Sequence, residues 1–341
     1  MKLLILMGVK MNNTTYQRGR PGYGSTSLFG LRGMIVTFQV IGMVFALAGL
    51  VAYIVYFGDI SNNISGDKNV QGRALAAMIL GLLTYLAWKT FYAGMIIIRF
   101  VRNSDDGEIT ANRFVLSALS LNLGGLLTPF ILTRLPNVPV RSTINPRWFL
   151  SRSMGMIAVV GAPCFLLVFF LSALNGGDSP LTTTQLFDKN AGAFGVTLGV
   201  LISQVVITLF AAITVAFYYQ KNSHDLFTGP KNALRTFMKI IAVIWLIVVT
   251  IELFILLFFA IVRIFGALAD VLNTLSDRNR GPLMLFAAVF NLMWTVAAMT
   301  YYIYTINKTI VGIWSDEGVV YGHFSGFARL EKAENGQTRQ R

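Results

Sequence analysis

Glu252 is an acidic residue in the middle of a long apolar stretch that begins after Lys239 and ends before Arg263. The stretch is as long as a helix that crosses the ~30 Å hydrocarbon core of a bilayer, so the carboxylate is expected near the midplane. An ionised carboxylate at that depth costs about 2.5–3.5 kcal/mol on insertion scales, so it must be neutralised by a cation or a proton. The pattern fits two interpretations: an ion, proton or substrate site, or a buried hydrogen bond between helices.

Lys89 is the candidate partner, because it lies midway along another apolar stretch. Its neighbours Tyr85, Trp88 and Tyr92 allow a second interpretation, in which the lysine lies at the membrane interface and its ammonium group reaches the headgroups. Gln204 is a further polar residue in an apolar stretch and can form hydrogen bonds across helices. The predicted intramembrane polar site consists of Glu252, Lys89 and Gln204.

A basic segment, residues 133–152, contains Arg141, Arg147 and Trp148 among several prolines. Arginines beside an aromatic ring on a proline-stiffened strand can bind a partner protein or an anionic lipid headgroup. The alternative is a connector with the ordinary excess of cations on the cytoplasmic side of a membrane. The predicted partner- or lipid-binding residues are therefore Arg141, Arg147 and Trp148.

The sequence contains none of the catalytic or metal-binding motifs that we considered. Its two histidines, His224 and His323, do not form a zinc-binding pair, and no phosphate-binding loop or nucleophile elbow occurs. The single cysteine, Cys164, cannot form a disulfide within the chain. We therefore expect no enzyme activity, no cofactor and no bound metal.

The net charge of +13 raises the question of nucleic acid binding. The cations, however, are interleaved with long apolar stretches, where cations set orientation and contact anionic headgroups. We therefore expect partners in the membrane, namely anionic lipids, other membrane proteins or further copies of this chain, and no nucleic acid.

The elements that must position these residues are transmembrane helices. Hydrophobic residues make up 55% of the chain and charged residues only 13%, whereas about a quarter of the residues are charged in soluble domains. We predict an all-α polytopic bundle of six transmembrane helices arranged as three hairpins. The predicted spans are 34–57, 74–101, 154–174, 194–219, 240–262 and 283–306, within a bundle of residues 33–308 that is flanked by a basic tail (1–32) and a polar tail (309–341).

Residues 114–132 are apolar enough to be considered as a seventh span, but Asn122, Gly124, Gly125 and Pro129 weaken a continuous helix there. We predict a re-entrant or interfacial segment that other helices cover. With six spans, 21 of the 28 Lys and Arg residues lie on one side and 6 on the other, whereas seven spans divide them 12 and 15. The cation-rich side is predicted to be cytoplasmic and to hold both termini.

Two functional classes remain. The first is a non-enzymatic subunit or scaffold of a membrane complex, which recruits partners through its basic tails and basic segment. The alternative is a permease or channel-like transporter with Glu252 in its pathway. We prefer the first, because a transporter of this size usually has more polar residues within its spans.

Overall fold

The computed structural model describes residues 29–65, 69–104, 108–109, 112–120, 140–141, 146–176, 180–189, 192–219, 232–276, 281–314 and 320–321. Its long helices are α2 (Phe29–Val55), α4 (Asn69–Asn103), α8 (Pro146–Asn175), α10 (Phe194–Tyr219), α11 (Ala233–Ser276) and α12 (Pro282–Trp314). Its short helices are α3 (Phe57–Ser65), α6 (Arg113–Leu119) and α9 (Thr183–Leu186). The two-residue strands β1 (Val140–Arg141) and β2 (Val320–Tyr321) pair antiparallel.

The six long helices are long and apolar enough to cross a membrane, and each overlaps one of the six predicted spans. The prediction of an all-α polytopic bundle is therefore confirmed, and the chain is an integral, multi-pass membrane protein. Helices suit this role because each one satisfies its backbone hydrogen bonds internally, which the bilayer core requires.

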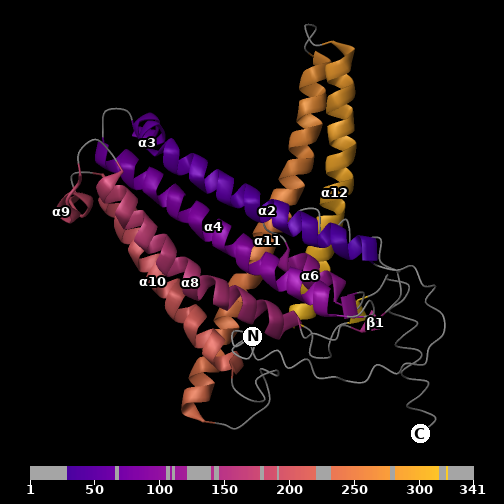
Figure 1. Cartoon of the computed structure of the whole chain (residues 1–341), viewed down its shortest axis with the longest axis horizontal. Coiled ribbons are helices and arrows are strands. Elements are labelled where there is room, and N and C mark those ends of the chain that lie inside the picture. The colour runs from indigo at the N-terminus through magenta and orange to yellow at the C-terminus, as the bar shows by residue number, and fades with distance from the viewer. Residues whose placement is uncertain are drawn as a thin grey trace.

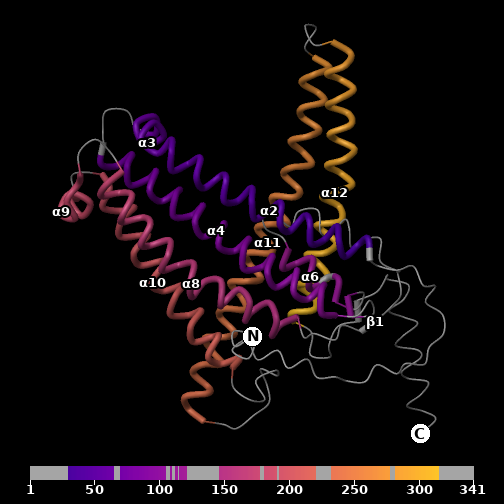
Figure 2. Tube along the Cα trace, viewed as in Figure 1, coloured from indigo at the N-terminus to yellow at the C-terminus, as the bar shows by residue number. Residues whose placement is uncertain are grey.

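Consecutive long helices pack as three hairpins: α2 with α4, α8 with α10, and α11 with α12. Because α4 also packs against α8, the first two hairpins form a four-helix unit in which α2, α4, α8 and α10 run side by side (Figure 1). The short helices α3 and α9 lie at the turns of these two hairpins. The α11–α12 hairpin crosses the four-helix unit steeply, and its far end projects beyond that unit (Figure 2).

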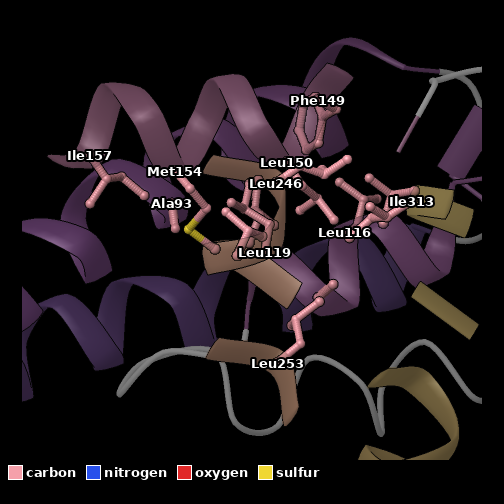
Figure 3. Close-up of a cluster of buried hydrophobic side chains, with 14 of the residues drawn as sticks. Ala93, Leu116, Leu119, Phe149, Leu150, Met154, Ile157, Leu246, Leu253 and Ile313 are labelled. Atoms are coloured by element: carbon pink, nitrogen blue, oxygen red, sulfur yellow. The ribbon is translucent and has the colours of Figure 1, made fainter. Parts of the chain in front are cut away.

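The largest core cluster lies where the hairpins meet. Figure 3 shows Ala93 of α4, Leu119 of α6, Met154 and Ile157 of α8, and Leu253 of α11 converging there. All five are buried, so this cluster joins the third hairpin to the four-helix unit. A second cluster lies near the turns of the first two hairpins and includes Phe57, Leu80, Phe165, Phe169 and Leu186.

The segment predicted to be re-entrant or interfacial begins as the short helix α6, which ends at Leu119 and is followed by a turn at Ser120. Val115, Leu116 and Leu119 are almost completely buried, and α6 packs against α4, α8 and α12. The described part is therefore a short helix covered by protein. Residues 121–139, which hold the rest of that segment and the start of the basic segment, lie outside the described residues.

The structure gives the α11–α12 hairpin a register that the sequence analysis did not address. The Trp314 indole nitrogen Nε1 donates a hydrogen bond to Thr250 Oγ1 at 3.0 Å, so these two residues lie level on antiparallel helices. The predicted spans 240–262 and 283–306 consequently overlap in height only near their ends. Hydropathy located both apolar stretches correctly, but their relative height depends on a contact between residues that are far apart in sequence.

Candidate intramembrane ion pair and capping arginines

Lys89 and Glu252 form an ion pair in which the lysine Nζ donates a hydrogen bond to the glutamate Oε1. Lys89 lies near the middle of α4, and Glu252 lies near the middle of α11. The pair therefore links the four-helix unit to the third hairpin at the place where they cross. Both charges lie on long apolar helices, where each alone would be costly to bury.

Protein covers the two charged groups unequally. The side chain of Lys89 is 9% exposed, whereas that of Glu252 is 41% exposed. The interfacial interpretation of Lys89 does not describe this structure, because its ammonium group points into the protein. The helix is fixed beside it, since the Trp88 indole Nε1 donates to the backbone oxygen of Ile157 on α8 at 3.1 Å. Tyr85, one turn earlier, is close enough to Glu252 to interact with its charge.

Gln204, the third residue of the predicted polar site, is not part of this pair. It lies on α10, and its amide Nε2 contacts Ser203 Oγ at 3.4 Å. Within the described part of the chain, no hydrogen bond joins it to Lys89 or Glu252. The structure thus brings together two of the three predicted residues. The third could not be placed from sequence, because α10 packs against α8 and α11 and has little contact with α4.

The chemistry open to the pair follows from the difference in exposure. The ammonium group of Lys89 is enclosed, so it acts as a fixed positive charge. The partly exposed carboxylate of Glu252 can accept a proton or a second cation, either of which competes with the lysine. Among the described residues, no group of three or more His, Cys, Asp or Glu side chains could hold a metal ion.

A second charged arrangement lies where helices return to one end of the bundle. Arg32, at the start of α2, donates to the backbone oxygens of Val101 and Ser104 at the end of α4, at 2.7 and 2.8 Å. Arg147, at the start of α8, donates from Nε to the backbone oxygen of Ile313 at the end of α12, at 2.6 Å. The last carbonyl groups of a helix have no partner within the helix and carry its negative dipole end, so both arginines cap helix C-termini.

Arg152 covers the end of α10. Its guanidinium carbon lies 4.5 Å from the centre of the Tyr219 ring, the last residue of α10, and 5.2 Å from that of Trp148. These distances are in the range of cation–π contacts. The helices α4, α10 and α12 therefore each end against an arginine from the start of α2 or α8.

The residues predicted to bind partners or lipids in the basic segment are placed as follows. Arg147 is buried and caps α12, and Trp148 lies against Arg152. The side chain of Arg141 and the basic tails lie outside the described residues. Sequence reasoning missed Arg32 and Arg152 as capping residues. The signal that could have found them is their position at the start of an outgoing helix, near the C-terminal end of a returning one.

Arg113, at the start of α6, is also buried at this end. Burial lowers the pKa of its guanidinium, while the neighbouring Tyr301 and Tyr304 of α12 act in the opposite direction. An arginine stays charged despite such a shift. Tyr301 and Tyr304 of α12 thus lie near a fixed positive charge from α6.

Replacing Glu252 by glutamine should destabilise the protein, because it leaves the enclosed ammonium group of Lys89 without its counter-charge. We expect a loss of about 1–3 kcal/mol, below the ~3–5 kcal/mol typical of fully buried pairs because Glu252 is partly exposed. Thermal unfolding in detergent micelles measures this loss of stability. The double variant Lys89→Met with Glu252→Leu should recover most of the loss, and additive destabilisation in the double variant would contradict a direct pair.

Replacing Arg147 by alanine should loosen the end of α12, because the carbonyl of Ile313 loses its donor. We expect about 1–3 kcal/mol of destabilisation and faster amide hydrogen exchange in the last turns of α12. Arg102→Ala is the matched control, since Arg102 is an exposed arginine in the last turn of α4. Equal effects of the two substitutions would show that Arg147 is not a specific cap.

Comparisons of the chain with models of known protein families, with curated proteins and with solved structures found no match. No function is therefore transferred to this chain from another protein. The residues that carry a functional argument are its own, namely the ion pair at the helix crossing, the capping arginines, and the exposed surface of the third hairpin.

Proposed function

We propose that this protein is a non-enzymatic subunit or scaffold of a membrane complex, and that the α11–α12 hairpin is the element that binds its partner. The observation that carries the proposal is the length of apolar hairpin that this chain leaves uncovered. Two quantities support it, the length of the hairpin against the bilayer and the difference in burial between its two halves.

The part of α11 from residue 240 to residue 276 is about 55 Å long at ~1.5 Å per residue, and from Arg263 onwards it also carries Asp270 and Asn273. A bilayer core about 30 Å thick holds a helix of about 39 Å when the tilt is ~40°, which is the upper end of the usual range. The whole of this helix therefore does not fit in the hydrocarbon core at the usual tilts. We infer that the part outside the core lies in the outer half and is covered by a partner.

One side of the inner half of the hairpin packs within the chain. Trp245, Leu246, Val249 and Leu253 of α11 are buried among the other helices. The outer half, residues 254–276 of α11 and 282–300 of α12, is different. Its exposed large side chains include Phe258, Phe265, Leu272, Leu275, Leu283, Phe286, Phe290 and Met293.

The capping arginines support an assignment of the cytoplasmic side. They gather at the end where α4, α10 and α12 finish, and an excess of cations marks the cytoplasmic side. We therefore infer that this end is cytoplasmic and that both termini lie there. The cations at this end can also attract anionic lipid headgroups.

A photo-crosslinking amino acid at Phe286 should capture another protein chain, whereas the same group at Phe45 should not. Both phenylalanines are exposed on long helices, at 72% and 68%, but Phe45 lies on the four-helix unit. The experiment uses the full chain in native membranes, with adducts separated by size. Lipid adducts alone at both positions would overturn the proposal.

A second candidate function rests on the exposed carboxylate of Glu252. A carboxylate near the middle of α11 that is 41% exposed and paired with a lysine supports a proton- or ion-coupled permease, because proton binding would release Lys89. Glu252→Gln should then abolish proton-dependent uptake in proteoliposomes that hold the same amount of folded protein, despite the loss of stability expected above. Asp270→Asn is the control, since Asp270 is an exposed acid farther along α11. Unchanged uptake in Glu252→Gln would exclude this candidate.

A further inference from the structure

Arg152 is a buried cation for which the described part of the chain supplies no counter-ion. The residue is 8% exposed, and its guanidinium contacts the rings of Trp148 and Tyr219. An aromatic ring attracts the positive charge but offers no lone pair to an N–H donor in the way that an oxygen does. Among the described residues, no carboxylate, carbonyl or hydroxyl oxygen accepts a hydrogen bond from this guanidinium. Its N–H donors are therefore available to an acceptor from outside the described chain.

The hydroxyl of Tyr92 is a second donor beside Arg152. Tyr92 lies on α4 and is partly buried, and its hydroxyl is close enough to Arg152 for the two groups to interact electrostatically. Within the described residues this hydroxyl has no hydrogen-bond partner either. Two donors from different helices thus lie together, and an anion with several oxygen atoms can accept hydrogen bonds from both.

These two donors are not sealed inside the protein. Neither the nitrogens of Arg152 nor the hydroxyl oxygen of Tyr92 belongs to the described polar atoms that are completely buried without a partner. Tyr219, which packs against Arg152, is 44% exposed. A ligand can therefore reach the donors where α10 ends beside α8 and α4 (Figure 1).

The donors lie at the level where part of the bundle leaves the hydrocarbon core. The apolar part of α8 begins at Met154, two residues after Arg152, and α10 ends at Tyr219, after which the sequence becomes polar. Tyrosine and tryptophan are enriched at this level in membrane proteins, beside the lipid headgroups. The anions closest to these donors are then the phosphate groups of the surrounding phospholipids.

We propose that Arg152 and Tyr92 bind the phosphate group of an anionic phospholipid, in a site lined by the rings of Trp148 and Tyr219. Arginine binds phosphate through two parallel hydrogen bonds, and basic pockets between transmembrane helices bind anionic headgroups. Inorganic phosphate offers the same oxygen atoms, but the position of the site among the headgroups favours the lipid. The inference does not depend on the proposed subunit role, which concerns the α11–α12 hairpin.

The other charges on α4 and α8 favour a headgroup with a net negative charge. Arg99 of α4 and Arg147 of α8 are cations, and Lys89 of α4 is already paired with Glu252. A choline group would add a positive charge to this end of the bundle, whereas the headgroup of phosphatidylglycerol is uncharged apart from its phosphate. Phosphatidylglycerol should therefore bind more tightly than phosphatidylcholine.

Native mass spectrometry of the delipidated full chain in detergent tests this site. The probes are phosphatidylglycerol, phosphatidylcholine and inorganic phosphate at equal concentrations. Phosphatidylglycerol should bind best, and Arg152→Gln should weaken its binding about tenfold or more, because a charged hydrogen bond is lost. The matched control is Arg102→Gln, which removes an exposed arginine at the same end of the bundle and should leave binding unchanged.

A milder variant covers the case in which Arg152→Gln does not fold. Tyr92→Phe keeps the ring and the arginine and should bind phosphatidylglycerol several-fold more weakly, whereas Tyr56→Phe, at the turn of the first hairpin, should bind it normally. Equal binding by Arg152→Gln and Arg102→Gln, or by the two tyrosine variants, overturns the site. Binding of inorganic phosphate but not of phosphatidylglycerol overturns the assignment to a lipid.

Discussion

A carboxylate inside an apolar helix has to be neutralised, and in this protein the neutralising group comes from a different hairpin. The Lys89–Glu252 pair therefore fixes where α11 crosses α4. Large apolar side chains fill the space around the crossing, but apolar contacts are not directional, and many relative heights of two apolar helices would bury similar areas. An ion pair is specific to one height and one face of each helix.

Three arginines are placed in a similar way, because each lies at the C-terminal end of another helix. Arg32 and Arg147 donate to carbonyl groups at the ends of α4 and α12, and Arg152 lies over the ring that ends α10. Arginines at this end therefore finish the helices, and Arg147 and Arg152 are buried among them, whereas Arg102 is exposed.

The third hairpin is built differently from the four-helix unit. Its inner half shares the core with α4, α6, α8 and α12, whereas most large side chains of the described outer half are exposed. The Trp314–Thr250 hydrogen bond sets the two apolar stretches at different heights.

The sequence by itself determined the class of the protein, its six long helices and the unusual position of Glu252, because hydropathy and charge are local properties of a stretch of residues. It also predicted that 114–132 would not form a continuous helix, and α6 does end at Leu119. Only the tertiary structure decided that Lys89, and not Gln204, meets Glu252, that Arg147 faces inwards, and that α11 and α12 are offset. These features depend on the relative height and rotation of helices far apart in sequence, and no periodicity within one helix specifies either quantity.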